Sequence, residues 1–113
     1  MAGKAGNRCY VNVSTAGTGS PFTTTTAISG FQTLSGAGFN TGDIVEYAIQ
    51  DGANYEDGWG VVSGATITRN VFDSSNAGAA INLSGSALCI ITLTAQGAQA
   101  ILAYTAQRLA GGL

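Results

Sequence analysis

The alternation of apolar and polar residues with a period of two, interrupted by glycine turns, constrains this chain more than any other feature. In the stretch RCYVNVS, Cys9, Val11 and Val13 alternate with more polar neighbours, and DIVEYAIQ (43–50) alternates in the same way. Successive side chains of a β-strand point to opposite faces, so both stretches are expected to be half-buried strands. WGVVSGATITRNVF (59–72) predicts a hairpin around a Ser-Gly turn.

Strands about ten residues apart with glycine-based turns predict a mainly β fold, either an antiparallel β-sandwich or a small barrel. The stretch LCIITL (88–93) is apolar on both faces. We therefore expect a central strand there, or a strand whose outer face lies against a partner. In the glycine-rich loop before residue 43, Phe31, Leu34 and Phe39 are expected to anchor the loop in the core.

The period changes near residue 96. Apolar positions then follow the i, i+3, i+4 spacing of one helix face, at Ala98, Ile101, Leu102, Thr105 and Leu109. Thr94 is placed to cap the start of such a helix, and Gly111 is placed to end it.

We expect this C-terminal helix to be short, and either to fold back on the sheet or to extend to a neighbouring subunit. The expected organisation is a single domain, with an N-terminal strand or arm and loop (1–30), a β-module core (31–94) and a C-terminal helix or arm (95–113).

Charge is scarce: 9% of the 113 residues are charged and 45% are hydrophobic, whereas about 25% are charged in ordinary soluble domains. This composition excludes disorder and favours an assembly subunit whose neighbours cover its surface. A small extracellular-type β domain with a Thr, Ser and Asn surface is the alternative. The basic residues stand apart at 4, 8, 69 and 108, which argues against nucleic acid as a partner.

No apolar run is long enough for a transmembrane helix, so no membrane partner is expected. The first ten residues lack the apolar region of a secretory signal, so the chain is expected to stay in the cytosol after synthesis.

Histidine is absent, which excludes Ser-His-Asp and Cys-His nucleophiles and His-ligated metals. We therefore expect no enzyme activity and no cofactor. Cys9 and Cys89 both lie in apolar runs, and we expect two buried, reduced thiols that act as small hydrophobes.

The acidic stretch QDGANYEDGWG (50–60) is the strongest candidate for a site. An EF-hand beginning at Asp51 fails, because Ala53 and Val62 occupy ligand positions. An irregular calcium site remains an alternative, with Asp51, Asn54, Glu56 and Asp57 as its ligands. Adjacent Glu56 and Asp57 would face opposite sides of an extended chain, so they make a poor pair for glycoside hydrolysis.

The favoured interpretation of this stretch is a strand connection. Asp51, Gly52, Gly58 and Gly60 would form turns, in which the aspartates bond their own backbone. Glu56 would be solvated or paired with a neighbouring chain. Trp59 would anchor the start of the following hairpin in the core.

The stretch from Phe31 to Thr94 resembles a small β module of tailed-bacteriophage virion proteins. The likeness is carried by GDIVEYAIQDGANYEDGWG, which matches a Gly-Asp strand entry and an I.DG.N.E.G.G segment, and by ATITRNVFDSSNAGAAINLSG. The second stretch matches an L.R strand, which makes Arg69 an anchor position. Ile67 stands where leucine is common, and Asn70 where threonine is usual.

The resemblance implies a virion structural protein that is made in the host cytoplasm. The expected role is an accessory capsid decoration (cement) protein that binds the major capsid protein and self-associates. A tail, baseplate or fibre-adaptor subunit is the alternative. The expected interface residues are Tyr10, Leu88, Ile90, Ile101 and Leu102.

Outside this class, a carbohydrate-binding module is the competing hypothesis. Tyr47, Tyr55 and Trp59 would form its stacking platform. The alternative for Tyr47 and Trp59 is a place in the core of a small β domain.

Overall fold

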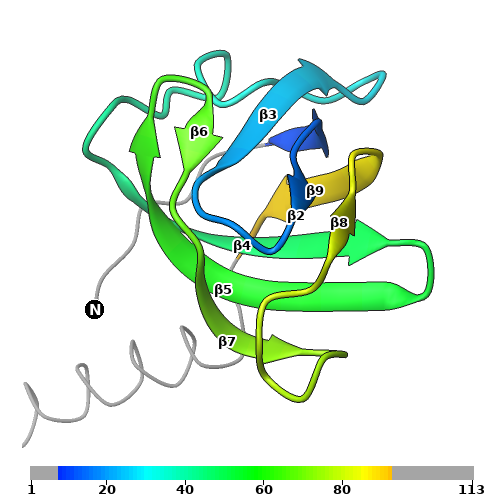
Figure 1. The fold of residues 1–113 in the computed structure, drawn as a ribbon. Helices are drawn as coiled ribbons and strands as arrows, with labels where there is room; N and C mark the ends of the chain where they lie inside the picture. The colour runs from blue at the N-terminus through cyan, green and yellow to red at the C-terminus, as the bar shows by residue number, and fades with distance from the viewer. Residues whose placement is uncertain (1–7, 93–113) are drawn as a thin grey trace, which may run out of the picture.

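The computed structural model describes residues 8–92, which build an antiparallel β-barrel (Figure 1). The strands in chain order are β1 (Tyr10–Val13), β2 (Ala16–Gly17), β3 (Phe22–Ala27), β4 (Ile44–Asp51), β5 (Asn54–Ser63), β6 (Thr66–Ile67), β7 (Asn70–Ser74), β8 (Leu83–Ser84) and β9 (Ala87–Ile91).

Six of these strands close the barrel. They follow the order β4-β9-β1-β3-β6-β5, and β5 pairs back with β4 through eight residue pairs. Strand β7 is added to β5, while β2 and β8 form a separate two-stranded ribbon. The fold is therefore the barrel rather than the sandwich of the two predicted architectures. Strands β1 and β3 are part of it, so residues 31–94 do not close a barrel without the N-terminal strands.

Because successive side chains of a strand point to opposite faces, every second side chain of a barrel strand lies in the core. In β1 the buried residues are Val11 and Val13, and β9 contributes Ala87, Cys89 and Ile91. Strand β9 lies between β1 and β4, which confirms the central position predicted from its sequence. Also in the interior, the rings of Phe22 on β3 and Tyr47 on β4 meet edge to face with centroids 5.0 Å apart.

The loop between β3 and β4 is anchored by two of the three predicted residues. Leu34 and Phe39 are buried. Phe31 is 39% exposed and lies outside the barrel. There its ring meets the ring of Tyr10 edge to face, with the two ring centroids 5.2 Å apart. The guanidinium carbon of Arg8 lies 5.5 Å from the same ring centroid. The prediction that Phe31 anchors the loop in the core is wrong.

The turn between β4 and β5 confirms one part of the interpretation of the acidic stretch. Gly52 has φ +63°, a left-handed conformation that favours glycine. The prediction that Asp51 bonds the backbone of its own turn is wrong. Its carboxylate instead accepts hydrogen bonds from the backbone N–H (2.7 Å) and the hydroxyl (2.8 Å) of Ser84. It thereby ties the end of β4 to the ribbon strand β8.

The rest of that stretch is strand and not turn. Gly58 and Gly60 lie inside the ten-residue strand β5 and are buried. A Cβ on Gly58 would lie 2.6 Å from the Tyr47 hydroxyl, and one on Gly60 would lie 2.6 Å from Cγ2 of Ile67. Both glycines are therefore needed for space inside the barrel, not for turn geometry.

Trp59 is also placed differently from the prediction. It lies between the inward-facing Gly58 and Gly60, so it belongs to the outer row of β5, where it is only half-buried. Its expected role as a core anchor is wrong.

The predicted C-terminal helix lies outside the described residues. Within residues 8–92, no helix is long and apolar enough to cross a membrane.

Candidate functional site: an interior ion pair and an outer apolar groove

A charged pair lies inside the barrel, between β5 and the segment that joins β6 to β7. Arg69 donates to both carboxylate oxygens of Glu56, at 2.6 Å from Nη2 to Oε1 and 3.1 Å from Nε to Oε2. The Tyr47 hydroxyl donates to Oε2 at 2.7 Å, and the backbone N–H of Ile81 donates to Oε1 at 3.0 Å. Glu56 is fully buried, so the prediction of a solvated Glu56 is wrong.

The remaining donors of the guanidinium are also used. Arg69 Nη1 donates to the carbonyls of Gly17 (3.2 Å) and Gly19 (3.1 Å), and Nη2 donates to the carbonyl of Ile81 (2.8 Å). These carbonyls belong to the chain around β2 and before β8, so one side chain holds both to the barrel. The anchor role that the resemblance implies for Arg69 has a definite geometry here, an ion pair with side-chain exposures of 2% and 0%.

Burial and hydrogen bonding act on Glu56 in opposite directions. Burial alone raises the pKa of this carboxyl, but the hydrogen bonds from Arg69, Tyr47 and Ile81 outweigh it, and the pKa lies below its ordinary value. The pKa of Tyr47 is raised, first by burial and then by its hydrogen bond to Glu56. This set of groups favours the ionised carboxylate of Glu56 in the core, where Arg69 balances its charge.

This arrangement predicts how stability depends on acid. Since the folded pKa of Glu56 lies below its unfolded value of about 4.3, its contribution is present above that value. It is lost as pH falls through the folded pKa. We expect Glu56→Gln to flatten the fall in the free energy of unfolding below about pH 4, measured by urea unfolding from pH 7 to 3. An unchanged slope in that variant would contradict the assignment.

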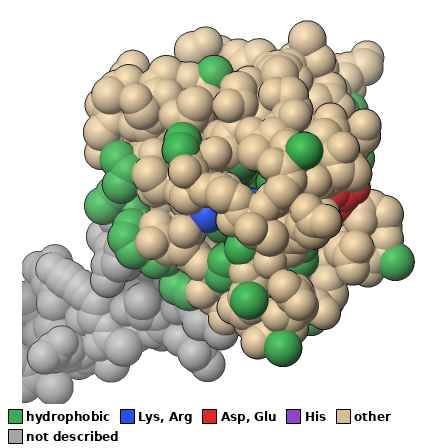
Figure 2. Space-filling view, in the orientation of Figure 1, with side chains coloured by type: hydrophobic (Ala, Val, Ile, Leu, Met, Phe, Trp, Pro, Cys, Tyr) green, Lys and Arg blue, Asp and Glu red, His purple; other side chains and the backbone are tan. Residues whose placement is uncertain are grey.

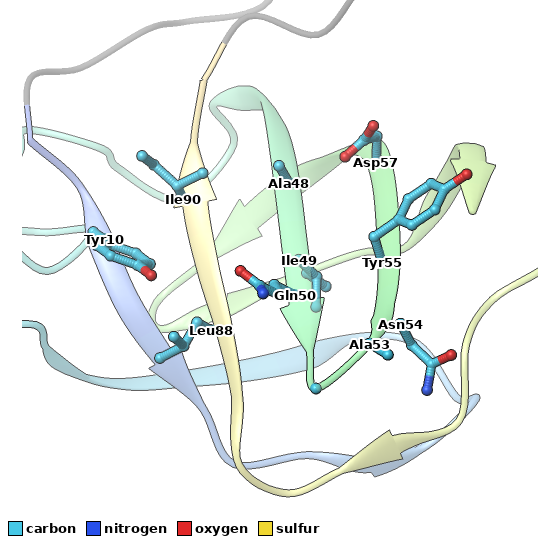
Figure 3. Close-up of a pocket in the computed structure, with 11 residues that line it drawn as sticks. Tyr10, Ala48, Ile49, Gln50, Ala53, Asn54, Tyr55, Asp57, Leu88 and Ile90 are labelled. Atoms are coloured by element: carbon cyan, nitrogen blue, oxygen red, sulfur yellow. The ribbon is translucent and has the colours of Figure 1, made fainter. Parts of the chain in front are cut away.

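The outer surface of the barrel carries a groove of about 590 Å³ over β1, β9, β4 and β5 (Figure 3). Two cross-strand rows build it. One row runs from Tyr10 through Ile90 and Ala48 to Asp57, and the other from Leu88 through Gln50 to Tyr55.

The floor of the groove is apolar and its edges are aromatic. Ala48, Leu88 and Ile90 lie between Tyr10 on one side and Tyr55 on the other (Figure 3). Ile90 is 38% exposed and Tyr55 is 44% exposed.

Asp57 lies at the edge of the groove. Partial burial raises the pKa of its carboxyl, and the nearby charges of Asp73 and Glu56 raise it further. The groove therefore offers mainly apolar surface, with the polar side chain of Gln50 between Leu88 and Tyr55 and Asp57 at its edge, which is compatible with a docking surface.

Three of the five predicted interface residues meet in this groove. Tyr10 and Ile90 are direct cross-strand partners on β1 and β9, and Leu88 lies two positions from Ile90 on the same face. Ile101 and Leu102 lie outside the described residues. Sequence reasoning missed Ala48, because a small residue in the outer row of β4 carries no signal until its neighbour β9 is known.

The residues named for the calcium site and for the sugar platform do not lie together in the structure. Glu56 points into the barrel while the next residue, Asp57, lines the outer groove, and Asp51 bonds Ser84. No group of three His, Cys, Asp or Glu side chains able to hold a metal gathers within the described part. Tyr47 is fully buried in the core, so it cannot share a sugar platform with Tyr55 and Trp59 on the outer row of β5.

Both cysteines are free and buried, as predicted from their apolar surroundings. Burial raises the pKa of Cys9 to about 11, and burial also raises the pKa of Cys89. Since the thiolate is the reactive form, both thiols are expected to be inert toward reagents in the native barrel.

No protein-family model, curated protein or solved structure matches this chain, so its function rests on the barrel, the interior ion pair and the outer groove.

Proposed function

We propose that this chain is a structural subunit of a tailed-bacteriophage virion, and that it serves as an accessory decoration protein of the capsid. The observation that carries the proposal is the apolar groove on the outside of a barrel whose core is already filled. A barrel does not need Leu88 and Ile90 on its outer face for its own packing. Such side chains gain free energy only when something else removes them from water, by about 25 cal/mol per Å² of apolar surface.

The sparse charge of the surface supports close packing against neighbours. The face seen in Figure 2 is dominated by uncharged polar side chains and backbone, with hydrophobic side chains scattered over it and few charged ones. The whole chain carries a net charge of -2. Repulsion between adjacent copies is therefore weak, which suits a subunit present many times on one particle.

The closed barrel supports a structural role as well. Closure gives each of the six barrel strands a paired neighbour on both sides, so among the described strands the open edges through which β-proteins aggregate are limited to β7 and the ribbon β2–β8. The interior ion pair fixes the ribbon β2–β8 to this frame. A closed barrel with an apolar outer groove fits a subunit that attaches to a preformed lattice.

A tail, baseplate or fibre-adaptor position is the alternative within the virion. Mixing the purified chain with mature capsids and, separately, with purified tails distinguishes the two. We expect binding to capsids at a fixed copy number, measured by sedimentation and densitometry. Binding to tails alone would assign the chain to the adaptor role, and binding to neither particle would refute the virion role.

Ile90→Asp tests the groove as the contact. A charge in the centre of the apolar floor must be desolvated on docking, so we expect at least a hundredfold loss of capsid affinity, about 2.7 kcal/mol. The barrel should stay folded, because Ile90 lies on its outer face. Ala65→Asp, an exposed position at the β5–β6 turn, is the matched control and should bind normally. Equal affinity of the two variants would exclude the groove.

A further inference from the structure

The groove lies beside the point where the chain leaves the barrel. Strand β9 ends at Ile91, one residue after Ile90, which forms part of the groove floor. The sequence continues to residue 113. We propose that residues 95–113 of the same chain occupy the groove in the free subunit, as the amphipathic helix that their sequence predicts.

The connection has the length that such docking needs. Three residues, Thr92, Leu93 and Thr94, separate the end of β9 at Ile91 from the predicted first helical residue, Ala95. Connections of two to three residues that end on a Ser, Thr, Asp or Asn cap are the ones that turn a helix back over the strand before it. Thr94 is such a cap. A helix that begins at Ala95 is therefore directed over β9 and its neighbours.

The dimensions of helix and groove also agree. Adjacent strands lie about 4.8 Å apart, so the four strands under the groove span about 14 Å, and a helix with its side chains is about 10 Å wide. At a rise of about 1.5 Å per residue, Ile101 and Leu102 lie about 10 Å along the helix from Ala95. That distance is about three residues of strand, so the apolar stripe reaches over Leu88.

The composition of the segment matches the floor of the groove. Its predicted stripe is apolar except for Thr105, and the single charged residue in 93–113 is Arg108. The N-terminal residues 1–7, MAGKAGN, offer no comparable stripe. Of the two chain ends, the C-terminal one is therefore the occupant that fits an apolar floor of Ala48, Leu88 and Ile90.

A segment that occupies the groove in the free subunit keeps the apolar floor from water and from other free copies. This occupancy does not rest on the proposed virion function.

Paramagnetic broadening in the full chain tests the occupancy. On a helical wheel Ala103 lies opposite the predicted stripe, so a spin label on Ala103→Cys leaves the contact intact. The buried native thiols leave the introduced cysteine as the reactive one. We expect the amide signals of Ala48, Leu88 and Ile90 to broaden several times more than that of Ala65 at the β5–β6 turn.

Two further variants of the labelled chain separate docking from chance proximity. Leu102→Asp places a charge on the stripe and should abolish the selective broadening, whereas Gln107→Asp on the opposite face should leave it unchanged. Uniform broadening in the parent labelled chain, or selective broadening that survives Leu102→Asp, would overturn the proposal. Broadening that occurs only between label and isotope on different molecules would also overturn it, because a second copy would then fill the groove.

The outcomes stay distinct from those for the virion role. Selective broadening in a chain that binds no virion particle would retain the docked segment and remove the virion function. Capsid binding without selective broadening would retain the virion function and remove the docked segment.

Discussion

Replacing Arg69 with methionine is expected to lower the free energy of unfolding by about 3–5 kcal/mol, the usual cost of removing one partner from a buried ion pair. The substitution leaves the Glu56 carboxylate fully buried without its cation. It also leaves the carbonyls of Gly17, Gly19 and Ile81 without the guanidinium donors that bind them. Urea unfolding at pH 7 measures the loss.

The pH dependence of this variant should reverse. Without Arg69, burial becomes the dominant effect on Glu56, and its folded pKa is expected to rise above the unfolded value. Stability then increases as pH falls through the folded pKa. The double variant Glu56→Gln/Arg69→Met should recover part of the loss, because no charge stays buried. Asp57→Asn, on the outer face, is the control. A loss below about 1 kcal/mol in Arg69→Met would show that the pair does not hold the barrel together.

Gly60→Ala is expected to destabilise the barrel by about 3 kcal/mol, the upper part of the range for overpacked cores. The added methyl group would overlap the carbonyl oxygen of Thr68 and lie 2.6 Å from Cγ2 of Ile67. Because the first obstacle is backbone, no change of rotamer relieves it. Thermal and urea unfolding report the effect.

Gly19→Ala is the matched control for this substitution. A Cβ at Gly19 has nothing within 4 Å and requires no left-handed backbone. We expect its stability to stay within about 0.5 kcal/mol of the parent, the range of ordinary surface substitutions. Similar stability of the two alanine variants would show that strand β5 has room to shift.

The strands themselves were predictable where hydrophobic alternation and burial agree. Val11 and Val13 in β1, and Cys89 and Ile91 in β9, are apolar and face the core. The apolar outer row of β9, at Leu88 and Ile90, lines the outer groove, and its contact with a partner stays a prediction. The choice between sandwich and barrel was not predictable, since it depends on β5 pairing with both β4 and β6, and alternation does not encode which strands meet.

The first half of strand β5, where the sequence predicts turns, escaped prediction because its pattern is inverted, whereas residues 59–63 were predicted as a hairpin strand. Its inner row begins with Glu56, Gly58 and Gly60, while Tyr55 and Trp59 lie outside. Hydrophobicity alone would place the outer row, with Tyr55 and Trp59, in the core. The physical reason is that the space above the glycines is filled by other elements, including the Tyr47 ring near Gly58. Two glycines spaced by two in an acidic stretch are the signal that marks such a close approach.

The groove was only half predictable for a related reason. Tyr10, Leu88 and Ile90 stand out as large apolar residues on faces that alternation assigns to the exterior. Ala48 and Gln50 join them only because β4 pairs with β9 over Tyr47–Gln50. A surface built from several strands is a property of their register, which no single stretch of sequence contains.

Strand order also decides when this protein can fold during its synthesis. Tyr10 pairs with Ile90, so β1 cannot complete its pairing until the ribosome has made β9, eighty residues later. At about 5–20 residues per second, this wait lasts roughly 4 to 16 s. Until β9 emerges, the apolar row of β1 and the edges of β1 and β4 that β9 later covers are open to neighbouring nascent chains. Slower initiation on each messenger, which spaces the ribosomes further apart, is therefore expected to raise the yield of soluble barrel.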